Sequence, residues 1–326
     1  MSHVLNVVDV GHGNCAVIQS EGKCVVVDAA SKVHLLKYLV KNNITVIDLM
    51  ILSHSDQDHI AGLQPVLASP EITVKRLVVS ADSQKHTDVW EDVRALIAER
   101  VEKNLLDLVL GVHSKSSNEW GVINDRLSLE VISPSSAMAL AGSGMAVANG
   151  TQKLTSNSIS IVLRVNFDGQ PIVLLAGDMD RIALDELLAK SPFAPVKFLV
   201  YPHHGGLPGN ACPVKFTNDI ISFFSPECII FSNGRNMHSN PRPQVVAALR
   251  KANAHLYIAC TQLSNSCCAE VVLERAYIPS NYSAGSSGGA YCSGTVEIDL
   301  ERAEILSELK QAHEQFVRGL DSRMCC

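Results

Sequence analysis

The chain lacks the features that would assign it to a membrane, a secreted or a generally basic class of protein. None of its 326 residues fall in a continuous apolar run of about 18, the length that a membrane-spanning helix needs. The start has no basic segment followed by a long apolar core, so we expect no export signal and a cytoplasmic protein. The net charge is −6, which argues against a generally basic nucleic-acid surface but leaves room for a local basic groove.

The cysteines also lack the spacing of a metal site. There are ten, with no CxxC pair among them, so a structural zinc is not expected. Several lie in apolar strand-like runs, such as Cys15 and Cys228, and we predict reduced, buried thiols. The terminal pair Cys325-Cys326 could also be a prenylation end in a eukaryote. With 47% hydrophobic residues, the chain can form one large domain or two small ones.

The densest group of ionisable side chains lies in the segment LSHSDQDHIAGL, residues 52–63. An apolar run at 46–52 predicts a buried strand before it, and residues 60–67 predict the opening of a helix after it. Alternate residues of an extended segment point the same way, so three of the four groups should share one side and the fourth can join at the turn. The four are His54, Asp56, Asp58 and His59.

Imidazoles and carboxylates this close together would be costly if they were left unpaired in a cleft. One or two divalent cations would remove that cost. Imidazole combined with carboxylate suits zinc, manganese or iron, without any cysteine. The alternative is a polar, solvated loop after a strand, and we favour the metal site because matching groups follow later in the chain.

Three later segments place such groups at predicted strand ends. A hairpin around Asp168-Gly169 ends in Ala176-Gly177-Asp178, where the small residues let the backbone approach a metal closely. A strand at 198–201 ends in two adjacent histidines, His203 and His204. A strand at 227–232 leads to a loop that contains His238.

The segment HSDQDHIAGL resembles the HxHxDH signature of the metallo-β-lactamase superfamily. It is most similar to the HxDxDH variant of the ComEC-type competence domains, which serve DNA uptake. Other segments agree in order: VVDVGHGNCAVIQ, NSISIVLRV, LLAGDMD, VYPHHGG and NMHSNPRPQVV. The resemblance runs from about residue 4 to about residue 262. It implies an α/β fold, the four-layer αβ/βα sandwich of the metallo-β-lactamase type.

The resemblance also implies two divalent ions, Zn²⁺ or Mn²⁺, about 3.5–4 Å apart. Asn157 stands where most members supply a further histidine, so the site is richer in oxygen and more open to manganese. The implied first site is His54, Asp56 and a bridging Asp178. The implied second site is Asp58, His59, Asp178 and His203, with His204 as a neighbouring contact, although the two histidines could exchange roles.

The same resemblance assigns the remaining roles. Asp58 can orient the attacking water, and His204 or His238 could donate a proton to the leaving oxygen. His12, in a turn at the cleft edge, could approach the site, but we expect a surface histidine. Asp28, at the end of a strand, is expected to enter a helix or support a ligand. β-Lactam hydrolysis is not expected, because the histidine-rich site of those enzymes is not reproduced.

We predict a hydrolase domain at 1–262. Residues 263–326 should add an irregular Ser/Gly/Cys-rich segment, an edge strand at 296–300 and a helix at 301–320, packed on the same domain. That helix could also dock on another subunit, giving a homo-oligomer or a protein partner. Residues 133–156 are a candidate lid over the substrate entrance.

The predicted function is a metal-dependent phosphodiester hydrolase, with a nuclease acting on DNA or RNA as the first interpretation. A phosphodiesterase for a small substrate such as a cyclic nucleotide is the second, favoured by the acidic chain and the candidate lid. A weakly active module of a larger defence or DNA-processing complex is the third. Fold-level kinship alone does not decide between them.

Overall fold

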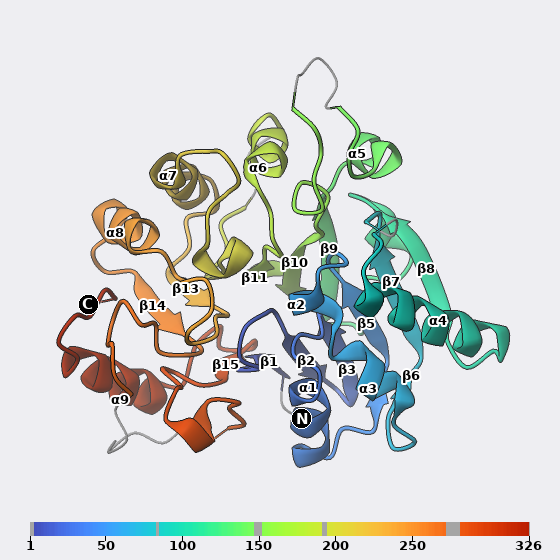
Figure 1. Cartoon of the computed structure of the whole chain (residues 1–326), viewed down its shortest axis with the longest axis horizontal. Helices are drawn as coiled ribbons and strands as arrows, with labels where there is room; N and C mark the ends of the chain where they lie inside the picture. Colours follow the sequence, from blue (N-terminus) through green and yellow to red (C-terminus); the bar gives the residue numbers. More distant parts are fainter. Residues whose placement is uncertain (1–2, 83–84, 147–151, 191–193, 272–280, 326) are drawn as a thin grey trace.

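The computed structural model describes residues 3–82, 85–146, 152–190, 194–271 and 281–325. Two β-sheets face each other across the middle of the molecule, and helices cover the outer face of each (Figure 1). Within the described residues, no helix combines the length and the apolar character needed to cross a membrane.

The first sheet has seven strands in the order β15-β1-β2-β3-β5-β7-β8. From β3 to β8 neighbouring strands run parallel. A small separate pair, β4 with β6, lies beside this sheet. The bounds are β1 His3–Val7, β2 Ala16–Ser20, β3 Lys23–Val27, β4 Val46–Ile47, β5 Leu49–Leu52, β6 Thr73–Val74, β7 Arg76–Ser80, β8 Asp107–Val112 and β15 Val296–Asp299.

The second sheet has six strands in the order β14-β13-β12-β11-β10-β9. It is parallel from β11 to β14, while β10 and β11 form the hairpin predicted at Asp168-Gly169. The bounds are β9 Leu127–Ser133, β10 Val162–Phe167, β11 Gln170–Leu175, β12 Phe198–Val200, β13 Cys228–Phe231 and β14 Tyr257–Cys260.

The helices form the two outer layers. Helices α1, α3 and α4 pack on the first sheet, and α6, α7, α8 and α9 pack on the second. Their ends follow local signals: the Thr87 hydroxyl caps α4 by accepting from the Trp90 N–H, and Asp180 caps α6. The bounds are α1 His34–Lys41, α2 Gln57–Ile60, α3 Leu63–Ala68, α4 Asp88–Glu102, α5 Ser136–Ala141, α6 Arg181–Leu188, α7 Pro213–Phe224, α8 Pro243–Ala252 and α9 Ser307–Arg318.

Three apolar cores hold these layers together. One lies between the sheets and takes side chains from both, such as Ile51 and Val173. The other two lie between each sheet and its own helices, and they include Leu39 on one side and Leu249 on the other. The architecture is therefore the predicted four-layer αβ/βα sandwich, the fold of the metallo-β-lactamase type.

Two elements differ from the sequence prediction. Helix α7 was not predicted, although Pro213 at its first turn and apolar residues at helical spacing indicate it. Helix α9 begins at Ser307 instead of residue 301, because the chain first makes a turn in which Asp299 and Glu304 exchange backbone hydrogen bonds. That turn keeps Ile305 and Leu306 out of the helix.

The carboxyl-terminal segment packs against both halves of the sandwich. Strand β15 pairs with β1 at one edge of the first sheet, and Val317 of α9 joins the core of the second. The boundary at residue 262 stays a prediction. Parts of two predictions, the candidate lid at 147–151 and the irregular segment at 272–280, lie outside the described residues, as does Cys326 of the terminal pair.

Candidate metal centre

The candidate centre lies where strand ends from the two sheets meet. In parallel strands the carboxyl ends share one edge of the sheet, where ligand sites form in open α/β sheets. The first sheet contributes the loop after β5, with His54, and the start of α2, with Asp58 and His59. The second contributes Asp178 after β11 and His204 after β12. Residues far apart in the sequence are thus brought to one place.

Close backbone packing allows this meeting. Gly177 has a φ of +52°, and a Cβ there would lie 2.4 Å from the Ser160 hydroxyl. That hydroxyl accepts the Asp178 N–H at 3.1 Å. A larger residue would collide with Ser160 and with the Ile161 carbonyl oxygen and would displace the Asp178 backbone, so the glycine before the aspartate is required for close approach.

The ionisable groups form two adjoining sets. In the first, His54, His59 and Asp178 each offer a ligand atom within 4.8 Å of the others. The distance from His59 Nε2 to Asp178 Oδ1 is 3.1 Å, and that from His54 Nε2 to Asp178 Oδ2 is 3.7 Å. The second set consists of His12, Asp58 and His204.

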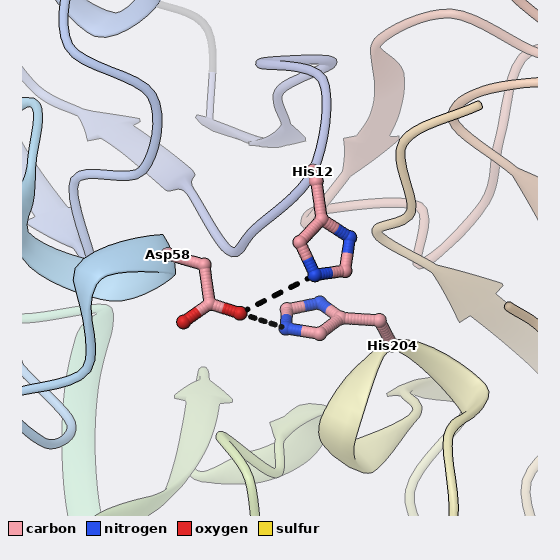
Figure 2. Close-up of side chains that lie close together, drawn as sticks. All are labelled: His12, Asp58 and His204. Carbon is pink, nitrogen blue, oxygen red and sulfur yellow. Dashed lines mark ion pairs between the residues drawn. The ribbon is translucent and has the colours of Figure 1, made fainter. Parts of the chain in front are cut away.

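Figure 2 shows the second set, in which both rings point at one carboxylate oxygen. Asp58 Oδ2 lies 3.3 Å from His204 Nε2 and 3.4 Å from His12 Nε2. The two sets adjoin because His204 Nε2 is also 3.8 Å from Asp178 Oδ1. Asp178 therefore lies between the two sets, as a bridging carboxylate would.

The orientation of the buried imidazoles fits a bound cation. His204 Nδ1 donates to the Ser232 carbonyl oxygen at 2.8 Å, so in the neutral ring Nε2 carries the lone pair. The Nε2 atoms of His54 and His204 are buried and have no hydrogen-bond partner. A lone pair that faces carboxylate oxygens is repelled, and although burial opposes it, the charges of Asp178 and Asp58 raise the pKa of His204. A divalent cation between these groups would take the place of that proton and bind both. These residues fit the metal that the resemblance implies.

The ionisable groups of the centre shift one another's pKa values. Burial disfavours ionised carboxylates, yet the neighbouring imidazoles hold the pKa of Asp58 and of Asp178 well below the ordinary value. Burial and the adjacent His59 lower the pKa of His54 well below its ordinary value. His54 is therefore a neutral imidazole near neutral pH, the form in which histidine binds metals.

Asp28 supports one of these imidazoles, as the sequence suggested. Its Oδ2 lies 2.7 Å from His59 Nδ1, and it also accepts the Ser53 hydroxyl at 2.8 Å. Oδ1 accepts the Ser53 N–H at 2.7 Å. A carboxylate on the far nitrogen fixes the tautomer and turns Nε2 toward the metal position.

Replacing Asp28 with asparagine is expected to weaken metal binding by about 10- to 100-fold, the usual effect of losing such a support. Asparagine tolerates the residue's positive φ of 61°, so the loss should come from charge and tautomer and not from backbone strain. Competition with a chelator measures the affinity. A similar affinity in the variant would contradict this role.

Three of the predicted site residues also make contacts outside the two sets. Asp56 lies 3.7 Å from His54 but also contacts the Lys85 ammonium. The His203 side chain is 38% exposed, and its Nε2 is 3.9 Å from Asp178 Oδ2. Its Nδ1 lies 3.0 Å from the Leu207 carbonyl oxygen, within hydrogen-bonding distance. His238 is exposed and stacks against His12, with ring centroids 5.0 Å apart.

The expectation that His12 is a surface histidine was wrong. Its side chain is only 11% exposed, and it contacts Asp58. Gly13, next to it, would place a Cβ 2.1 Å from the Asp58 carbonyl oxygen, so the turn is pressed against the start of α2. The signal available in the sequence was the tight GHGN turn itself.

Comparison with known proteins supports the superfamily. Residues 8–114, less than half of the chain, match the family model of the Metallo-beta-lactamase superfamily. The matched residues include the motif at 54–59 and strands β2 to β8 of the first sheet, and the match agrees with the four-layer fold. Closeness to ComEC-type domains stays a prediction. Among curated proteins none matches the chain significantly.

Solved structures resemble the fold at low identity. Igni18, a metallo hydrolase from the archaeon Ignicoccus hospitalis, is 14% identical over 77% of this chain and 91% of that chain, with a TM-score of 0.43. YhfI from Bacillus subtilis is 12% identical over 75% and 93%, with a TM-score of 0.45. Human tRNase Z, short form, is 10% identical over 69% and 91%, with a TM-score of 0.38. At this level the likenesses carry no conclusion about the substrate.

Proposed function

We propose that the chain is a metal-dependent phosphodiester hydrolase and that its substrate is a nucleic acid. The observation that carries the proposal is the pair of adjoining imidazole and carboxylate sets around Asp178, with buried ring nitrogens that lack hydrogen-bond partners. Divalent cations bound there would activate water and stabilise charge on a phosphoryl oxygen. The sequence prediction of two ions, Zn²⁺ or Mn²⁺, is kept as part of the proposal.

The ligand assignment changes in two respects. His204, buried and aimed at both Asp58 and Asp178, takes the role that the sequence analysis gave to His203. His54, Asp56, Asp58, His59 and Asp178 keep their proposed roles, and His12 is a further candidate ligand on the side of Asp58. His203, nearly two-fifths exposed, is then free to contact the substrate.

A pocket beside the centre offers residues that could contact a substrate. A pocket of about 530 Å³ opens beside Asp58, and its lining includes His12, His238 and Lys32. We propose that Asp58 orients the attacking water and that His238, at the solvent edge, donates a proton to the leaving oxygen. Lys32 supplies positive charge for a phosphate in an otherwise acidic chain.

The size of this pocket favours a second candidate. About 530 Å³ lies within the range of sites that enclose small ligands, so a phosphodiesterase for a cyclic nucleotide is the alternative. The third interpretation, a weakly active module of a larger complex, would use the exposed face of α9 for a protein partner or a second copy. A cytoplasmic location stays a prediction.

Incubation with Mn²⁺ or Zn²⁺ and a panel of single-stranded and double-stranded DNA, RNA and cyclic nucleotides tests the proposal. We expect cleavage of at least one polymer, abolished by a chelator and restored by the metal. Turnover of cyclic nucleotides alone would favour the second candidate. Metal binding without any turnover would contradict an enzyme and favour the third.

A further inference from the structure

A lysine lies beside the first of the two ligand sets. Lys85 lies against the first set, where its ammonium contacts Asp56 Oδ1 and donates to the Ser156 hydroxyl at 3.1 Å. Asp56 is the carboxylate that the first metal position would use. A lysine ammonium has three donors and no lone pair, so it pairs with carboxylates and cannot itself bind a cation.

Asp82, which follows β7 closely, also contacts the metal motif. Asp82, buried at the end of β7, accepts the Ser55 hydroxyl at 2.6 Å and the Ser55 N–H at 3.2 Å. Ser55 lies between the two motif residues His54 and Asp56. Asp82 therefore holds the end of β7 against the motif, and Lys85 is held by its own contacts with Asp56 and Ser156.

The two carboxylate oxygens of Asp178 have different neighbours. Oδ2 lies 3.7 Å from His54 Nε2 and 3.9 Å from the Nε2 atom of the partly exposed His203. Oδ1 lies 3.1 Å from His59 Nε2 and 3.8 Å from His204 Nε2, and His204 and His12 both also face Asp58. A cation placed near Asp58 can therefore meet more ligand atoms than a cation placed near Asp56.

We propose that the Lys85 ammonium takes the place of one divalent cation, so that the chain binds a single metal ion, on the side of Asp178 that faces His59, His204, Asp58 and His12. This inference rests on the proposed function and revises its metal content from two ions to one. Lys85 is then a positioning residue that holds Asp56 and neutralises its charge. Its side chain is 29% exposed, so the same ammonium is open to a phosphoryl oxygen of the substrate.

Metal content tests the inference directly. Protein saturated with Mn²⁺ and freed of excess ion should contain one Mn²⁺ per chain by elemental analysis. Its electron paramagnetic resonance spectrum should be that of an isolated ion. Lys85→Ala and Lys85→Met, which remove the charge and release Asp56, should each raise the content to two ions and give a spin-coupled spectrum. Lys85→Arg, which keeps the charge, should stay at one.

Lys37→Ala is the control, because Lys37 is an exposed lysine of α1 that no described contact links to Asp56. It should keep one ion per chain. Two ions in the unaltered protein would overturn the inference and leave the proposed function standing. A single ion in both Lys85→Ala and Lys85→Met would also overturn it. Protein and variants that bind no ion at all would overturn the proposed function itself.

Discussion

Replacing Asp178 with asparagine is expected to lower phosphodiester cleavage on the order of 10³-fold, with loss of bound metal. The side chain is 3% exposed and lies between the imidazoles of His54, His59 and His204. Asparagine has nearly the same shape, so the backbone and the Ser160 contact can stay. The change removes the one charge that both ligand sets share.

The measurement compares initial rates on the best substrate of the panel, together with metal content by elemental analysis. Asp92→Asn, on the exposed face of α4, is the matched control and should leave both values unchanged. An Asp178→Asn protein that is folded, retains its metal and cleaves within about tenfold of the original rate would be incompatible with Asp178 as a metal ligand.

The second prediction with a large expected effect distinguishes the roles of the adjacent histidines His203 and His204. We expect His204→Ala to lower cleavage by about 10²-fold or more and to weaken metal retention, because even the loss of a residue supporting a ligand costs about 10- to 100-fold. His203→Ala should retain the metal and change the rate only several-fold, mainly through KM. The pair is matched in residue type, in position along the chain and in backbone conformation.

Metal retention during dialysis and the separate values of kcat and KM measure this difference. Thermal unfolding of both variants shows whether loss of the buried ring has destabilised the fold instead. If His203→Ala lost its metal while His204→Ala kept it, the original sequence assignment would be right and the geometric one wrong.

The sequence predicts the fold and most of the centre because these depend on local patterns. Apolar runs at β5, β11 and β12, each followed by small or ionisable residues, predict strand ends and the groups that follow them. His54, Asp58 and Asp178 could be found in this way. The four-layer arrangement follows from the resemblance and is confirmed by the two sheets and their outer helices.

The order of the two histidines depends on a detail that the sequence does not carry. His203 and His204 both have positive φ, 52° and 55°, an unusual conformation for residues other than glycine. In that turn successive side chains swing to different sides, so one ring is buried and the other faces solvent. The rule that alternate residues of an extended segment point to the same side, which placed the residues of the 52–63 motif, does not apply in this turn.

His12 and Lys85 illustrate the other limit. Each reaches the centre through a contact between segments that are distant in sequence: His12 with Asp58, and Lys85 with Asp56. A histidine in a turn and a lysine before a helix are ordinary surface residues by composition. His12 comes to the centre because its turn packs against α2, and Lys85 because its ammonium contacts the motif residue Asp56.

The placement of ligands on both sheets has a consequence for how the two halves of the molecule depend on each other. His54, Asp58 and His59 belong to one half, and Asp178 and His204 to the other. Neither half carries a full set of candidate ligands alone, so a bound ion would link the two halves of the sandwich. Relative movement of the two sheets would separate these side chains and weaken ion binding, and a bound ion would add to the apolar core in holding the sheets together.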